Sequence, residues 1–126
     1  MRDHTRLRAF QLADVLVLAV YRITRGFPRE EQFGLTSQMR RAAISVASNI
    51  VEGCARRTEA DYLHFLDMAF GSLRELSYQL SLSFRLGHIR QDDYQSVRQQ
   101  AEECSKVLAA LIRSLRRAQQ PNSLKA

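Results

Sequence analysis

Acidic and histidine side chains share a short stretch in the middle of the chain. Asp61, His64 and Asp67 stand three residues apart, so on a helix each carboxylate lies about one turn from the imidazole. Such a group could bind a metal or carry out acid–base chemistry. A di-iron bundle needs two Glu-x-x-His turns and further carboxylates, and this chain has no such pair of turns. We therefore predict an exposed His64, with no metal, no cofactor and no catalytic residue.

A second pattern would suit RNA cleavage. Arg57 and His64 have the Arg-x6-His spacing seen in a superfamily of helical RNA-cleaving domains, where the pair lies in a cleft of the bundle. So short a pattern often arises by chance, and Arg57 stands at an expected helix junction beside Thr58. A weak RNase is therefore kept as an alternative, and the protein is predicted not to be an enzyme.

Arginine dominates the charge of the chain. The 126 residues carry 19 basic and 13 acidic side chains, a formal net charge of +6, and only Lys106 and Lys125 are lysines. Guanidinium groups bind phosphate in a planar, bidentate manner, which favours RNA or DNA as a partner, although a GC-rich genome would produce the same bias. No acidic residue follows Glu103. The candidate nucleic-acid contacts lie near the two ends of the chain: Arg2, Arg6, Arg8, Arg113, Arg116 and Arg117.

A polar stripe along one predicted helix indicates a contact with protein. Met39, Val46 and Ile50 lie on the apolar side of this helix. The candidate polar residues follow a second stripe and continue onto the next helix: Gln38, Arg41, Ser45, Asn49, Glu52 and Glu75. We expect them to form hydrogen bonds between subunits or between helices, with Glu75 pairing with Arg41, because a paired arginine can fix the register of two surfaces. A solvated face is the alternative interpretation.

Apolar periodicity places these candidates on four helices. They are predicted at residues 5–25, 36–55, 59–86 and 91–118 of one domain, 1–126, with a frayed tail at 119–126. Short links force neighbouring helices to be antiparallel, so the expected fold is an all-α, up-down-up-down four-helix bundle. The first and third helices carry more apolar surface than one bundle can bury, which favours a homo-oligomer.

Local signals mark the expected helix ends. Thr36 is the predicted N-cap of the second helix, and Thr58 opens the third with Asp61 in a variant capping box. Gly26 and Gly87 suit left-handed ends of the first and third helices. Two more glycines, Gly53 and Gly71, are expected to let helices approach closely.

The sequence favours a cytoplasmic protein without a membrane segment. Arginines precede the apolar run 15–20 as in a signal peptide, but Asp14 interrupts the pattern and Tyr21 stands where small cleavage-site residues would be needed. The run is also far shorter than the ~20 apolar residues that span a bilayer. Cys54 and Cys104 form no Cys-x-x-Cys motif and are interpreted as small apolar side chains in a reducing compartment.

The motif set resembles a bacterial family of four-helix bundles named for proteins encoded in 23S rRNA intervening sequences. The similarity covers roughly residues 9–115. The residues that carry it, in family order and spacing, are Tyr21, Thr24, Phe27-Pro28, Glu31, Phe33-Gly34-Leu35-Thr36, Gln38, Arg40-Arg41-Ala42-Ala43, Ser45, Ser48-Asn49-Ile50, Glu52-Gly53, Arg57, Phe65-Leu66, Ala69, Gly71-Ser72, Glu75-Leu76 and Leu86-Gly87. Val51 stands where the family usually has a small alanine, and Cys54-Ala55 replaces a polar residue and glycine.

The resemblance implies a left-handed bundle that assembles into a ring, with five subunits as the family's characteristic state. It implies no enzymatic activity. A related branch acts as an accessory factor in diversity-generating retroelements, where it binds nucleic acid and a reverse transcriptase through a basic surface. The expected function is therefore a nucleic-acid-associated scaffold or accessory protein. A protein-only assembly module, whose partners are itself and another protein, is the main alternative.

Overall fold

Helices account for all regular secondary structure in residues 2–120, the part of the chain that the computed structural model describes. The predicted all-α class is confirmed. In chain order the elements are the 3-10 turn η1 (His4–Arg6), α1 (Arg8–Thr24), the 3-10 turn η2 (Arg29–Glu31), α2 (Leu35–Cys54), α3 (Glu59–Arg85) and α4 (Gln91–Ala118). Most of the predicted tail, residues 121–126, lies outside the described part, and the left-handed twist stays a prediction.

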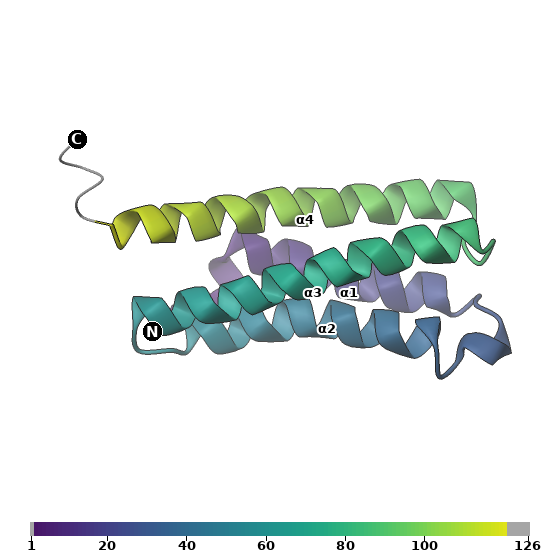
Figure 1. Ribbon diagram of the computed structural model, residues 1–126, viewed down its shortest axis with the longest axis horizontal. Helices are drawn as coiled ribbons and strands as arrows, with labels where there is room; N and C mark the ends of the chain where they lie inside the picture. Colours follow the sequence, from purple (N-terminus) through teal and green to yellow (C-terminus); the bar gives the residue numbers. More distant parts are fainter. Residues whose placement is uncertain (1, 121–126) are drawn as a thin grey trace.

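The four long helices lie side by side in one elongated bundle (Figure 1). Each helix packs against the next along the chain, and α1 also packs against α4. The amino-terminal segment, the α2–α3 turn and the end of α4 lie toward one end of the bundle, while the α1–α2 and α3–α4 links lie at the other (Figure 1). The first residues of α1 lie beside the middle of α4, where Arg8 pairs with Glu103. Consecutive helices therefore run in opposite directions, which brings the two terminal segments of the chain to the same end.

The core is built from apolar side chains at helical spacing on the inner face of each helix. Leu66, Leu73 and Leu80 on α3 are completely or almost completely buried, and so are Met39 and Ile50 on α2. Burying one such side chain contributes about 1.5–3 kcal/mol, so these rows supply most of the driving force for packing. The closest packing is between α2 and α3, where α2 presents small residues to its neighbours. This pair of helices carries the polar stripe.

The ends of α3 follow their local sequence. Thr58 Oγ1 accepts a hydrogen bond from the Asp61 backbone N–H at 3.1 Å, so the predicted cap is confirmed. At the other end Gly87 has φ 83°, and the N–H groups of Gly87 and His88 donate to the carbonyls of Phe84 and Ser83. This is a Schellman ending, which glycine adopts without steric cost.

Three expected features of α1 and α2 differ from the structure. Helix α1 begins at Arg8 rather than at residue 5, because Asp3 accepts a hydrogen bond from the Thr5 N–H and caps the separate turn η1. Gly26 does not have a positive φ; among residues 2–120 only Gly87 does. Thr36 is not the N-cap of α2, which begins at Leu35 and receives no side-chain bond from the residue at its cap position.

Glu31 takes over the capping of α2. Its Oε1 accepts a hydrogen bond from the Leu35 N–H at 3.2 Å, and its Oε2 lies 3.0 Å from Nε2 of His88 in the α3–α4 link. The carboxylate folds back over Gly34, where an added Cβ would lie 2.7 Å from Oε1. The Leu35 N–H and then the His88 ring hold the pKa of Glu31 below its usual value of 4.5. One side chain thus joins the two links at this end of the bundle.

We expect Glu31→Gln to lower stability at neutral pH and to remove part of its loss in acid. A lowered pKa in the folded state stabilises the protein above pH 4.5, and this stabilisation is lost as pH falls through the folded-state pKa. The denaturation midpoint of the variant, measured between about pH 7 and pH 3, should therefore approach that of the wild type in acid. Glu30→Gln removes the same charge from an exposed neighbour and serves as the control. Parallel curves for wild type and Glu31→Gln would contradict the prediction.

Candidate nucleic-acid and subunit interfaces

Arginines from three segments gather at the end of the bundle where α4 finishes. From the sequence alone, the arginines near the two chain termini could have lain at the same end of the bundle or at opposite ends. They lie at the same end because α1 and α4 run in opposite directions (Figure 1). The α2–α3 turn adds two more. We call this group the arginine end: Arg2, Arg6, Arg56, Arg57, Arg113, Arg116 and Arg117. The predicted contact Arg8 lies further along the bundle, where it meets Glu103 midway along α4.

Three of the predicted nucleic-acid contacts are ion-paired within the chain. Arg2 lies 2.6 Å from Glu59, Arg8 lies 2.6 Å from Glu103 and Arg116 lies 2.5 Å from Asp67, as N–O distances. Their side chains are partly or mostly solvent-exposed, and such surface pairs each contribute only about 0–1 kcal/mol. These pairs link helices, but they also reduce the local positive charge.

Four guanidinium groups of the arginine end have no partner in the described part of the chain. Arg6, Arg113 and Arg117 are exposed and form no side-chain hydrogen bond or ion pair there. Arg57, in the α2–α3 turn, is exposed and unpaired in the same way. All five N–H donors of each group are therefore free for an external acceptor such as phosphate.

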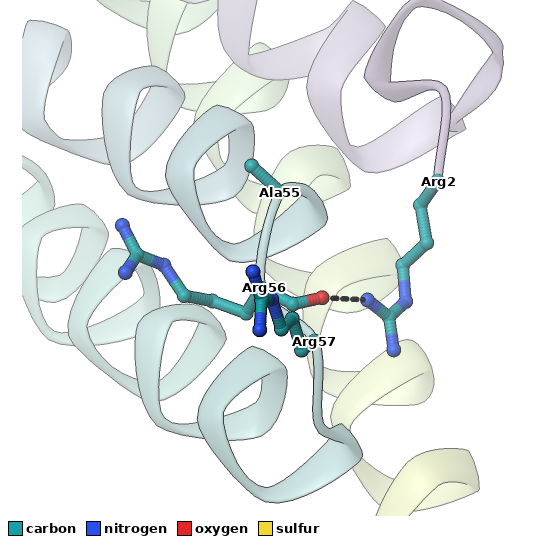
Figure 2. A pocket seen from close by; sticks show the side chains of 4 residues that line it. All are labelled: Arg2, Ala55, Arg56 and Arg57. Carbon is teal, nitrogen blue, oxygen red and sulfur yellow. Dashed lines mark hydrogen bonds between the residues drawn. The ribbon is translucent and has the colours of Figure 1, made fainter.

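A cavity of about 590 Å³ lies beside the α2–α3 turn and is lined by Arg2, Ala55, Arg56 and Arg57 (Figure 2). Arg2 reaches across and donates a hydrogen bond from Nη1 to the Arg56 carbonyl oxygen at 3.1 Å (Figure 2). The guanidinium of Arg2 also lies 4.0 Å from the centre of the Tyr62 ring. Arg2 therefore fastens the amino-terminal segment to the turn.

Sequence reasoning missed Arg56 and Arg57 as members of this surface. The signal was present as two adjacent arginines in a link between helices, whereas the sequence patterns relate Arg57 only to its spacing from His64 and to the family motif. Arg56 lies with its guanidinium 4.7 Å from the Phe65 ring centre, while Arg57 is free. No side-chain hydrogen bond or ion pair joins Arg57 to His64, and the imidazole instead contacts the Phe65 ring edge at 5.9 Å between centroids.

Part of the polar stripe holds α2 against α3. The Ser45 and Ser72 hydroxyl oxygens lie 2.9 Å apart and share a hydrogen bond between the helices. Asn49 donates through Nδ2 to the Ser45 carbonyl oxygen at 2.8 Å and to the Ser45 hydroxyl at 3.0 Å. Ser45 and Asn49 are thus satisfied within one chain.

The other stripe residues have free side chains. Gln38, Arg41, Glu52 and Glu75 are exposed, and within residues 2–120 none of their side chains forms a hydrogen bond or ion pair. Arg41 and Glu75 line the same groove of about 420 Å³ between α2 and α3, yet the described residues form no ion pair between them. The expected Arg41–Glu75 partnership is therefore not formed inside the chain.

Gln79 and Gly71 complete this region of α3. Gln79 lines the groove and is only 5% exposed, but its Oε1 has no hydrogen-bond partner among the described residues. Gly71 is exposed, and no described atom of a neighbouring helix lies within 4 Å of an added Cβ. The expected close approach at Gly71 is therefore wrong within one chain, whereas Gly53 does meet α3 closely, with an added Cβ 2.9 Å from Cβ of Phe65.

The thiols are buried and poorly suited to chemistry. Burial raises the pKa of Cys104 to about 11 and also raises that of Cys54, so both remain protonated near neutral pH. Among the described residues, no three histidine, cysteine, aspartate or glutamate side chains gather as a metal site. No helix in residues 2–120 combines the length and apolar content needed to cross a bilayer.

The family model described as 23S rRNA-intervening sequence protein matches residues 5–110, most of the chain. The chain belongs to this family. The resemblance noted in the sequence is thereby confirmed. The match begins within η1 and ends within α4, eight residues before the helix finishes, so the groove and part of the arginine end lie in the family region.

A solved structure has the same fold as this member of the 23S rRNA-intervening sequence protein family. It is the crystal structure of a protein with unknown function from the S23 ribosomal protein family of Bacteroides thetaiotaomicron. The two chains are 22% identical, with a TM-score of 0.77, and the similarity covers 82% of this chain and 97% of the other. At this identity the likeness shows the shared bundle alone. No curated protein is significantly similar to the chain.

Proposed function

We propose that this protein is a non-enzymatic homo-oligomeric scaffold, most simply a ring of five, that binds nucleic acid through the arginine end. The observation that carries the proposal is the gathering of four unpaired, exposed guanidinium groups at one end of the bundle. Phosphate is the acceptor that such groups bind best. The aromatic side chains lie mostly on apolar faces, so binding is driven by phosphate and depends little on base sequence.

Assembly increases the total positive charge that this surface presents to a polyanion. Each chain carries a formal +6, so five copies carry about +30. Repeated copies of the arginine end would bind one polyanion at several points, which raises affinity without requiring a deep site. The family description points to an association with 23S rRNA genes, and genomic location by itself does not specify an activity.

Exposed apolar side chains support the oligomer. Leu18 is 63% exposed on α1, Tyr78 is 60% exposed on α3, and Val15 and Leu86 are about half exposed. Val15 and Leu18 lie one turn apart on α1, and a subunit contact over them would remove their apolar surface from water.

The test measures binding and assembly on the same sample. Purified protein is titrated with structured RNA and with duplex DNA between about 50 and 200 mM salt, and light scattering gives its mass in parallel. We expect a mass about five times 14.5 kDa and an affinity that falls by about 10³-fold over this range, since several phosphates are neutralised.

Other outcomes would contradict separate parts of the proposal. No binding at about 50 mM salt with the oligomer intact would exclude the nucleic-acid role and leave a protein partner as the explanation of the surfaces. A single-chain mass at every concentration would exclude the scaffold. Cleavage of the RNA without divalent ions, lost in His64→Ala, would instead identify the RNase alternative.

A further inference from the structure

The α2–α3 groove contains a buried acceptor to which the described part of the chain offers no donor. Gln79 is 5% exposed and lines the groove with Oε1 unpaired. Buried amide oxygens in folded proteins almost always accept a hydrogen bond, because an unpaired one has lost its water without compensation. Glu75, one turn before Gln79 on α3, adds a second free acceptor to the same groove. A donor that enters the groove from outside the chain can therefore meet Glu75 directly, and Gln79 Oε1 once its amide turns toward the groove.

The opposite wall of the groove offers a free donor. Arg41, on α2, lines the groove with its guanidinium unpaired among the described residues. Between the two walls the lining consists of small residues, Ala42, Ser45 and Ser72. A fitting partner thus presents an acid, an apolar side chain and a strong donor in that order.

Helix α1 of this same protein carries such a row on its exposed side. Asp14, Leu18 and Arg22 are spaced four residues apart, which places them on one stripe of the helix. Leu18 is 63% exposed, and its neighbour Val15 is 49% exposed. Neither Asp14 nor Arg22 forms a side-chain hydrogen bond or ion pair with the described part of the chain.

We infer that α1 of a second copy lies across the α2–α3 groove. Asp14 of the second copy pairs with Arg41, its Leu18 packs on the small residues between the two walls, and its Arg22 donates to Glu75 and, once the amide turns toward the groove, to Gln79 Oε1. The forked guanidinium serves both acceptors, since they stand one turn apart on α3. Charge complementarity thus identifies the occupant of the groove as a second copy of this chain.

This contact joins two different surfaces of the protein. In a head-to-tail contact of this kind, the copy at one end of an open assembly keeps a free groove and the copy at the other end keeps a free α1 stripe, until the ring closes. The inference rests on the proposed homo-oligomer and adds which residues meet. It also accounts for the stripe residues Arg41 and Glu75, which remain unpaired among the described residues although they line the same groove.

Charge exchange tests the pairing. Arg41→Glu and Asp14→Arg should each raise the dissociation concentration of the oligomer by about tenfold or more, because each places like charges together. The double variant, with both changes in one chain, recreates the pair with reversed signs and should recover most of the assembly. Mass by light scattering gives the readout, and circular dichroism verifies that every variant remains helical. Arg29→Glu, at an exposed and unpaired position in η2 outside the α1 stripe, is the control.

Each result supports or overturns the inference. Single variants that keep the wild-type mass, or a double variant that stays dissociated, would overturn the Arg41–Asp14 pairing. If the oligomer instead re-forms in a chain that carries both Arg41→Glu and Glu75→Arg, the grooves of two copies face each other in a two-fold contact. That result would also overturn the Arg41–Asp14 pairing. Leu18→Ser should weaken assembly, whereas Phe33→Ser, at a side chain 89% exposed in the η2–α2 link, should not. A wild type that is a single chain throughout would contradict the proposed homo-oligomer itself.

Discussion

Replacing Arg6, Arg113 and Arg117 together by glutamine is expected to remove most of the affinity for nucleic acid. These side chains are exposed, unpaired and at one end of the bundle, so each can neutralise a phosphate without first breaking an internal ion pair. Each phosphate that the protein no longer neutralises makes the slope of log affinity against log salt shallower by about 0.7–0.9. Three such phosphates per chain, repeated in an oligomer, correspond to an affinity about tenfold or more weaker at moderate salt.

The matched control removes the same charge from the opposite end. Arg25, Arg29 and Arg90 are exposed and unpaired, and they lie in or beside the α1–α2 and α3–α4 links. Glutamine at these three positions should leave the salt slope close to that of the wild type. Equally weakened binding in both triple variants would show that only total charge matters, and the arginine end would then have no special role. Salt titrations by fluorescence anisotropy provide the measurement.

The second large effect is expected at Gly53, where α2 lies close against α3. An added Cβ would lie 2.9 Å from Cβ of Phe65 and 3.2 Å from Cδ1 of Tyr62, and the first of these atoms is fixed to the α3 backbone. Gly53→Ala must therefore push the two helices apart, at a cost of about 1–3 kcal/mol in the free energy of unfolding. The better helix propensity of alanine offsets up to about 1 kcal/mol of this.

Gly71→Ala provides the comparison for Gly53→Ala. It adds the same methyl group to an exposed helical position with open space, so we expect unchanged stability or a gain of up to about 1 kcal/mol. Urea unfolding followed by circular dichroism at one protein concentration compares the two variants. If the Gly53→Ala variant is as stable as the wild type, Phe65 can move aside at little cost in free energy.

Several features of the fold could be predicted because their causes are local. The rows that contain Leu66, Leu73 and Leu80 repeat with the helical period, and an apolar stripe of this length has to be buried. Thr58 caps α3 through a bond to a residue three positions away, and Gly87 ends the helix through its own backbone freedom. Residues close in the sequence are sufficient to determine such helix faces and helix ends.

The failed helix-end prediction shows where local reasoning stops. Thr36 has the side chain of a good N-cap, yet Glu31 folds back over Gly34 and accepts from Leu35 while also binding His88. That arrangement depends on the α3–α4 link being at the same end of the bundle as η2. His88 lies 57 residues from Glu31 in the sequence, so no spacing rule could have joined them.

By itself, the sequence determined the helical class, the number of long helices, the surplus of arginine and the family to which the chain belongs. These features follow from periodicity, composition and motif order, none of which depends on which residues are neighbours in space. Only the tertiary structure decided that the two terminal arginine clusters share one end, that Arg2, Arg8 and Arg116 are paired while Arg6, Arg113 and Arg117 have no partner in residues 2–120, and that Gln79 is buried there without a donor. The physical reason is that pairing and burial depend on distances between residues on different helices, and those distances exist only once the helices have packed.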